Sequence, residues 1–235
     1  MKHVFFKISG TLFFSLLISC STDKGEKTGE ITTQQIVFDT LAIGDKIYRS
    51  LNIPDSDYVF ENFESDGIDS LAILKCNGAV FRENDTLILK CNNGKIIRLK
   101  NIRSEEDNME FYNFIGLNKD INAYIITRSL YEAFDVWLIN KQTGDSLITI
   151  GFPAVSPDKK KFVCTNVDLE AAFSSNGIEL FKNEDNKYTS VGFRELNDWG
   201  PERAMWKNDT TLIIKAMQRA DPGKTATLYK ALYIK

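Results

Sequence analysis

The 235-residue sequence contains one histidine, His3, which lies in the first short segment of the chain. If that segment is removed on export, the remaining chain has no histidine. Such a chain cannot form a Ser-His-Asp or Cys-His nucleophile pair, a histidine-ligated zinc site or a histidine acid–base catalyst. Carboxylate pairs, Ser-Lys dyads and tyrosine or arginine chemistry remain open. We therefore expect a non-catalytic protein rather than an enzyme.

The sequence also lacks a hydrophobic run long enough to cross a membrane, which takes about 20 residues. Its apolar run from Ile8 to Ile18 follows Lys2 and Lys7 and has the length of a signal-peptide core. The stretch Leu17-Ile18-Ser19-Cys20 that ends this run resembles the lipobox of bacterial lipoproteins. That resemblance implies a signal peptide over residues 1–19 and a lipidated Cys20. The alternatives are an ordinary secretory signal and an uncleaved membrane helix.

Runs of basic residues are absent as well. Without Lys2 and Lys7, the 29 basic residues fall to 27 against 32 acidic ones, which gives a formal charge of −5. We therefore expect no nucleic-acid partner, and no adhesion of the domain to anionic lipid through its net charge. Residues 20–33 are polar and charged without hydrophobic periodicity, which predicts a lipidated flexible tether. The predicted location is the cell envelope, most simply the outer membrane, facing either the periplasm or the surface.

No long segment has the 3.6-residue period of an amphipathic helix. Residues 34–235 contain short apolar or alternating runs, such as 71–74, 87–89 and 162–164, separated by turns rich in Gly, Asn, Asp and Pro. This pattern predicts an all-β domain.

An internal repeat refines the prediction of an all-β domain. An apolar residue, a turn containing aspartate and a strand recur four times, and the turn aspartates are Asp85, Asp120, Asp158 and Asp209. The segment Ser156-Pro157-Asp158-Lys159 and its following strand resemble the SPDGK motif of TolB-like and WD40-like β-propellers, with Lys159 in place of the usual Gly. The resemblance implies a propeller-like array of about four degenerate four-stranded blades. A small ring, an open blade stack, and a sandwich with a β-meander all remain open.

The segment 62–73 resembles the calcium loop of FG-GAP and VCBS propeller repeats. The resemblance implies Ca²⁺ ligands at Asn62, Glu64, Asp66 and Ser70. Asn and Ser replace two aspartates of that motif, so any site would be weak, and a turn that holds no metal is the preferred interpretation. No other cofactor is expected.

Loops between the predicted strands carry the candidate ligand-binding residues. The repeat places the loops after 124–126, 162–164 and 212–214 at one end of their blades, and a further loop is expected over 198–203. The candidates are Arg128, Tyr131, Asp168, Glu170, Trp199 and Arg219. The alternative is that these are solvated charges and that Trp199 covers the core.

The cysteines other than Cys20 are Cys76, Cys91 and Cys164. Outside the cytoplasm a Cys76–Cys91 disulfide is permitted, and small buried side chains are the equal alternative. Cys164 is expected in the core.

These observations together predict an envelope lipoprotein, anchored to the membrane by lipid, with a binding or scaffolding domain for a protein or glycan partner. The alternatives are a histidine-free glycoside hydrolase that uses Asp168 and Glu170, and an immunity- or inhibitor-type lipoprotein.

Overall fold

The computed structural model describes residues 39–54, 58–60, 69–104, 108–220 and 223–234. The chain divides into two units, residues 1–35 and 36–235, and every described residue belongs to the second. The predicted signal peptide, the predicted lipidation site Cys20 and the predicted tether lie outside the described residues.

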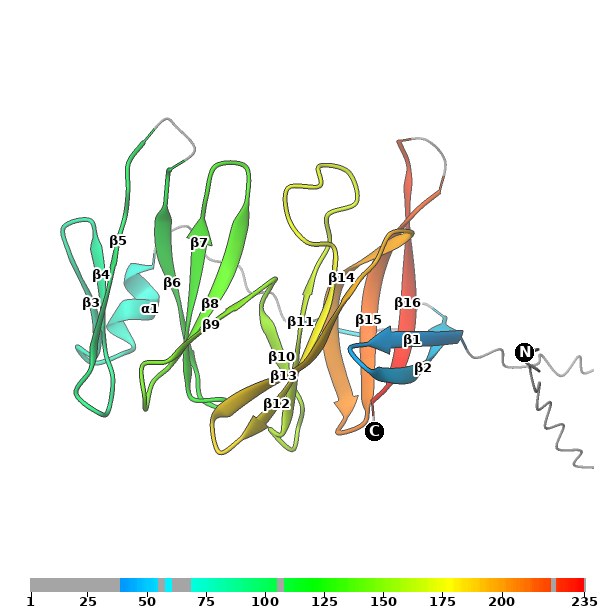
Figure 1. Ribbon diagram of the computed structural model, residues 1–235, viewed down its shortest axis with the longest axis horizontal. Helices are drawn as coiled ribbons and strands as arrows, with labels where there is room; N and C mark the ends of the chain where they lie inside the picture. Colours follow the sequence, from blue (N-terminus) through cyan, green and yellow to red (C-terminus); the bar gives the residue numbers. More distant parts are fainter. Residues whose placement is uncertain (1–38, 55–57, 61–68, 105–107, 221–222, 235) are drawn as a thin grey trace, which may run out of the picture. The chain divides into compact units, whose positions relative to one another are not determined.

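The described part of the chain is an all-β domain of four antiparallel sheets, as the sequence predicts (Figure 1). The first sheet contains β3 (Val80–Glu83), β4 (Thr86–Lys90) and β5 (Ile96–Lys100). The second contains β6 (Phe111–Asn118), β7 (Ala123–Ser129), β8 (Phe134–Asn140) and β9 (Ser146–Thr149). The third contains β10 (Pro153–Val155), β11 (Lys161–Asn166), β12 (Gly177–Glu184) and β13 (Lys187–Glu195).

The fourth sheet joins the two ends of the domain. It contains β14 (Trp199–Asn208), β15 (Thr211–Arg219), β16 (Thr225–Tyr233), β2 (Lys46–Ile53) and β1 (Asp39–Ile43), in that order. β16 is the last strand of the chain, and the hairpin of β1 and β2 pairs with it through β2. The expectation of four strands per unit holds for the second and third sheets, whereas the first has three strands and the fourth has five.

The four turn aspartates of the sequence repeat occupy matching places. Asp85, Asp120 and Asp158 lie in the turns β3–β4, β6–β7 and β10–β11, each between the first two strands of a sheet, and Asp209 lies in the β14–β15 turn of the fourth sheet. Adjacent turns also touch, because the backbone N–H of Asp158 donates to Asp209 Oδ1 at 2.8 Å. Lys159 has a φ of 60° at the position where the propeller motif has Gly. This residue therefore adopts the left-handed conformation that favours glycine.

Buried side chains lie between successive sheets. In β7, Tyr124 and Ile126 belong to the cluster with the first sheet, and Ala123 and Ile125 belong to the cluster with the third. In β11, Phe162 and Cys164 pack with the second sheet, and Val163 packs with the fourth. Because both faces of the second and third sheets are covered, their central strands are continuous apolar runs rather than alternating ones.

Two local expectations are wrong. Residues 71–74 were expected as a strand, but they lie in the helix α1 (Ser70–Leu74). Leu and Ala are good helix formers, and Ala72 and Ile73 pack against the cluster between the first and second sheets. Residues 198–203 were expected as a loop, yet β14 begins at Trp199. Pro201 is tolerated there because β14 is an edge strand with a register shift between Pro201 and Arg203.

Candidate functional site

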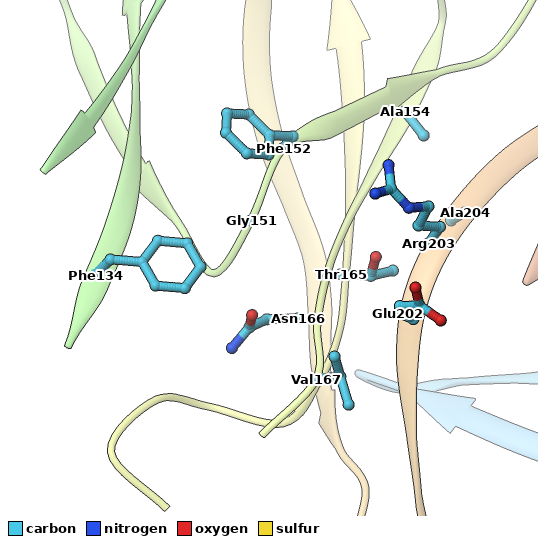
Figure 2. A pocket seen from close by; sticks show the side chains of 10 residues that line it. All are labelled: Phe134, Gly151, Phe152, Ala154, Thr165, Asn166, Val167, Glu202, Arg203 and Ala204. Atoms are coloured by element: carbon cyan, nitrogen blue, oxygen red, sulfur yellow. The ribbon is translucent and has the colours of Figure 1, made fainter. Parts of the chain in front are cut away.

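A groove of about 210 Å³ opens between the second, third and fourth sheets (Figure 2). Its wall is built from the start of β8, the link between β9 and β10, the end of β11 and the middle of β14. The lining residues are Phe134, Gly151, Phe152, Ala154, Thr165, Asn166, Val167, Glu202, Arg203 and Ala204. We call this cavity the groove.

Two phenylalanines form the apolar part of the groove. Phe134 is 42% exposed at the start of β8, and Phe152 is half-buried in the link before β10. In Figure 2 both rings lie on one side, with Thr165 and Arg203 across the cavity from Phe134. A large aromatic side chain left partly exposed at a cavity provides apolar contact area for a ligand.

Polar side chains line the rest of the groove, with Asn166 near Phe134 and Glu202 across from it (Figure 2). Asn166 donates from Nδ2 to the carbonyl of Ser175 at 2.9 Å, which fixes its amide at the groove wall. The register between β14 and β15 shifts from Pro201 to Arg203, so Glu202 occupies a β-bulge. Bulges redirect side chains next to binding sites. The Glu202 carboxylate lies 3.0 Å from the ammonium of Lys215.

Close backbone packing holds the groove together. A Cβ atom at Gly151 would lie 2.1 Å from the carbonyl oxygen of Thr165, so only glycine lets the β9–β10 link approach β11. Asn176 ties the β11–β12 loop to β14, because its Nδ2 donates to the carbonyls of Leu196 and Trp199, and its Oδ1 accepts the Asp168 N–H. The groove therefore has a rigid frame under its lining side chains.

Arg128, a predicted ligand contact, is already occupied by protein groups. Its guanidinium makes a two-pronged ion pair with Asp135, with contacts of 3.1 and 2.5 Å, and lies 3.3 Å from Glu110. It also lies 5.1 Å over the ring of Trp137. The hydrogen bonds that Arg128 donates to Asp135 are the main cause that raises the pKa of Arg128. These contacts indicate that Arg128 stabilises the second sheet.

Asp168 organises the loop that follows β11. Its two carboxylate oxygens accept four backbone N–H groups, from Ala171, Ala172, Phe173 and Ser174, at 2.8–3.0 Å. These hydrogen bonds, the one from Ser174 first, lower the pKa of Asp168. Both oxygens are therefore committed to the backbone, while the neighbouring Glu170 is exposed to solvent. This geometry does not resemble a pair of catalytic carboxylates facing a substrate.

The other predicted contacts also lie outside the groove lining. Trp199 packs against the cluster between the third and fourth sheets, and the ammonium of Lys230 lies 5.1 Å over its ring. Tyr131 is 51% exposed in the β7–β8 loop, and Arg219 is exposed at the end of β15. The structure therefore does not bring Trp199, Arg128, Tyr131, Asp168, Glu170 and Arg219 together into one site.

The calcium ligands Asn62, Glu64 and Asp66 lie outside the described residues, and Ser70 is the first residue of α1. Where side chains are described, no group of three or more His, Cys, Asp or Glu residues could hold a metal ion. The calcium site stays a prediction.

Cys76, Cys91 and Cys164 are free thiols in the structure. Cys164 is fully buried, as expected for a core residue. Burial raises the pKa of both Cys76 and Cys91, which reduces the thiolate fraction that disulfide formation needs. The Cys76–Cys91 disulfide is not formed here and stays a prediction.

None of the six candidate residues named from the sequence lines the groove, although some of the predicted loops border it. Phe134 and Asn166 border two of the three loops that the repeat placed at one end, and Glu202 and Arg203 lie in the further segment, 198–203, that was predicted as a loop. Phe152 had no signal of its own. The juxtaposition of Gly151 and Phe152 with β14 depends on contacts between residues about 50 positions apart.

No family model, no curated protein and no solved structure matches this chain. None of the helices in the described ranges is long and apolar enough to span a bilayer.

Proposed function

We propose that this chain is a lipid-anchored envelope protein whose β domain binds one unit of a glycan in the groove. The observation that carries the proposal is the composition of the groove. Two phenylalanines lie beside an amide and a hydroxyl from β11 and a carboxylate and a guanidinium from β14. A few polar groups set into an aromatic wall are typical of small-molecule sites.

This composition suits a sugar ring. The C–H face of a pyranose is apolar and packs against aromatic rings such as those of Phe134 and Phe152. Its hydroxyls both donate and accept hydrogen bonds, and they match Asn166, Glu202 and Arg203. At about 210 Å³ the groove is smaller than the roughly 300–1,000 Å³ of drug-sized ligand sites. One unit of a longer chain therefore fits better than a large free ligand.

The fold supports a binding role at this end. We propose that the four sheets form a propeller-like array, in which the turn aspartates mark one end and the loops of the groove mark the other. The evidence is the placement of the aspartate turns and the packing of each sheet on the next. Loops on a rigid sheet scaffold are common binding sites.

Catalysis by Asp168 and Glu170 gains no support from the geometry, because the oxygens of Asp168 accept backbone N–H groups. The one carboxylate among the groove-lining residues, Glu202, is paired with Lys215. A single paired carboxylate is short of the two that glycoside hydrolysis uses. Binding is the function that these residues support best.

The lipid anchor would keep the groove at the membrane. Several acyl chains on Cys20 would give stable attachment, because each buried CH₂ group contributes about 0.8 kcal/mol. The polar stretch over residues 20–33 would let the domain reach glycans of the envelope. We expect Cys20→Ala to move the protein from the membrane fraction to the soluble fraction without changing its unfolding midpoint. Retention of Cys20→Ala in the membrane fraction would show that the lipid is not the anchor.

The groove is tested by titrating the full chain, purified in detergent, against a panel of envelope glycans. We expect Phe152→Ala to weaken binding about tenfold, the effect of losing about 1.4 kcal/mol of contact energy. Tyr131→Ala is the matched control, since Tyr131 is an exposed aromatic residue outside the groove lining. If no glycan binds, or if both variants lose affinity equally, the assignment of the groove is wrong.

A further inference from the structure

A second cavity, of about 360 Å³, lies where β12 of the third sheet faces the hairpin of β1 and β2. Its lining residues are Lys46, Tyr48, Lys160, Lys161, Leu180, Lys182, Asn183, Glu184, Val191 and Ile234. We call it the lysine pocket, because four of these ten residues are lysines. The glycan groove shares none of its lining residues.

Asp158 is an anionic neighbour of two of the four lysines, Lys160 and Lys161, whose charges help to lower its pKa. Lys161 lies 4.0 Å from Asp158, at the limit of an ion pair. Lys46, Lys160 and Lys182 are exposed, and none of them forms an ion pair with another residue of the described ranges. Glu184 is the one carboxylate among the lining residues, so the pocket carries a local excess of positive charge in an acidic protein.

Backbone contacts fix the spacing of these lysines. The backbone N–H of Asn183 donates to the carbonyl of Lys160 at 2.8 Å, and its Nδ2 donates to the carbonyl of Lys159 at 2.7 Å. The β10–β11 turn is thereby held against the end of β12. The backbone positions of Lys160, Lys161 and Lys182 are therefore fixed relative to one another. This lowers the entropic cost of bringing their side chains to one ligand.

Asn183 supplies an independent indication of a ligand. It is 8% exposed, and its Oδ1 is the buried side-chain acceptor that has no hydrogen-bond partner in the described part of the chain. A buried polar atom without a partner destabilises the folded protein, and a ligand that supplies the partner removes that penalty. A hydroxyl donor at the pocket wall would satisfy this oxygen.

We propose that the lysine pocket binds a phosphate ester that carries hydroxyl groups. The ammonium groups of Lys46, Lys160 and Lys182 would hold the phosphate oxygens, because compact ammonium charges suit phosphate. A hydroxyl of the ester would donate to Asn183 Oδ1. The ester has two sources with the same chemistry, a soluble polyol phosphate and a lipid headgroup such as phosphatidylglycerol. If the ester is the lipid headgroup, the domain would bind anionic lipid through the lysine pocket despite its net negative charge.

The soluble arm of the test uses the full chain in a maltoside detergent, which contains no phosphate. Calorimetric titration with glycerol 3-phosphate at constant ionic strength should show saturable binding at one site. Inorganic phosphate should bind about fivefold more weakly, because it lacks the glycerol hydroxyls, one of which would donate to Asn183 Oδ1 while the phosphate stays on the lysines. The double variant Lys160→Gln/Lys182→Gln should bind about 25-fold more weakly, at about fivefold per lysine. Lys207→Gln is the matched control, because Lys207 is exposed on β14 outside the pocket.

The lipid arm compares the full chain in vesicles of phosphatidylcholine with and without added phosphatidylglycerol. The measurement is the rate at which an acetylating reagent modifies each lysine. If phosphatidylglycerol slows the acetylation of Lys46 and Lys182 but not that of Lys207, the lipid headgroup is the source of the ester. Saturable binding of glycerol 3-phosphate without lipid protection would assign the soluble source. The proposal is overturned if neither arm shows an effect, or if Lys207→Gln weakens binding as much as the double variant does.

Discussion

Replacement of Asn176 by alanine should cost about 3 kcal/mol of unfolding free energy. Asn176 is 7% exposed, and its side chain makes three hydrogen bonds: to the carbonyls of Leu196 and Trp199 and from the N–H of Asp168. The bond to the Leu196 carbonyl is buried, and that carbonyl should cost about 1–1.5 kcal/mol when left without a donor. The bonds with the Trp199 carbonyl and the Asp168 N–H are partly buried, and each should cost about 0.5–1 kcal/mol. The small cavity left by the amide accounts for the remainder.

The assays are urea unfolding and thermal unfolding, both followed by tryptophan fluorescence. For a domain of about 200 residues, a loss of 3 kcal/mol should lower the melting temperature by about 6–12 °C, with the urea m-value unchanged. The control is Asn92→Ala, since Asn92 makes an exposed side-chain hydrogen bond to Gln142 at 2.9 Å and should cost at most about 0.5 kcal/mol. A loss below about 1 kcal/mol for Asn176→Ala would refute the claim that this amide ties the β11–β12 loop to β14.

Three further outcomes follow from buried or hydrogen-bonded groups. Asp168→Asn should speed amide exchange at Phe173 and Ser174 about tenfold, because one amide oxygen replaces two carboxylate acceptors. The pKa of Asp168 is lowered in the folded protein, so the stability that its carboxylate contributes is present above the unfolded pKa. That stability should be lost as the pH falls through the folded pKa. Burial raises the pKa of Glu179, so the stability associated with its protonated form is lost as the pH rises through the folded pKa. Glu179→Gln should therefore have an unfolding free energy about 1 kcal/mol above that of the wild type at pH 7, measured by urea unfolding. In acid, where Glu179 is protonated, the two proteins should have the same unfolding free energy. Phe162→Ala should cost about 3–5 kcal/mol in the same assay, because Phe162 is fully buried and stacks on Phe181 with ring centroids 4.8 Å apart.

The all-β class and the place of the aspartate turns could be predicted because they depend on local signals. Period-two and continuous apolar runs identify strands, and Asp or Asn in a turn identifies the connection between them. The helix α1 could not be separated from a strand in this way, because a run of four or five apolar residues fits both structures. Its packing against the second sheet decides the outcome.

The site residues were harder to predict because their roles depend on distant partners. Arg128 and Asp168 are charged loop-end residues, which is why they looked like ligand contacts, but Asp135 and the 171–174 backbone occupy them. Glu202 faces the groove because of a register shift against β15, and no pattern within β14 shows such a shift. Phe152 reaches the groove only through the close approach of Gly151 to Thr165.

The most direct test of the central claim, that the groove binds a glycan, is hydroxyl-radical footprinting of the full chain with and without envelope glycan. Phe134 and Tyr131 are 42% and 51% exposed, so both rings should be oxidised readily in the free protein. Residue-resolved mass spectrometry should show that glycan protects Phe134 and leaves Tyr131 as reactive as before. Equal protection of the two residues, or protection of neither at saturating glycan, would contradict the account.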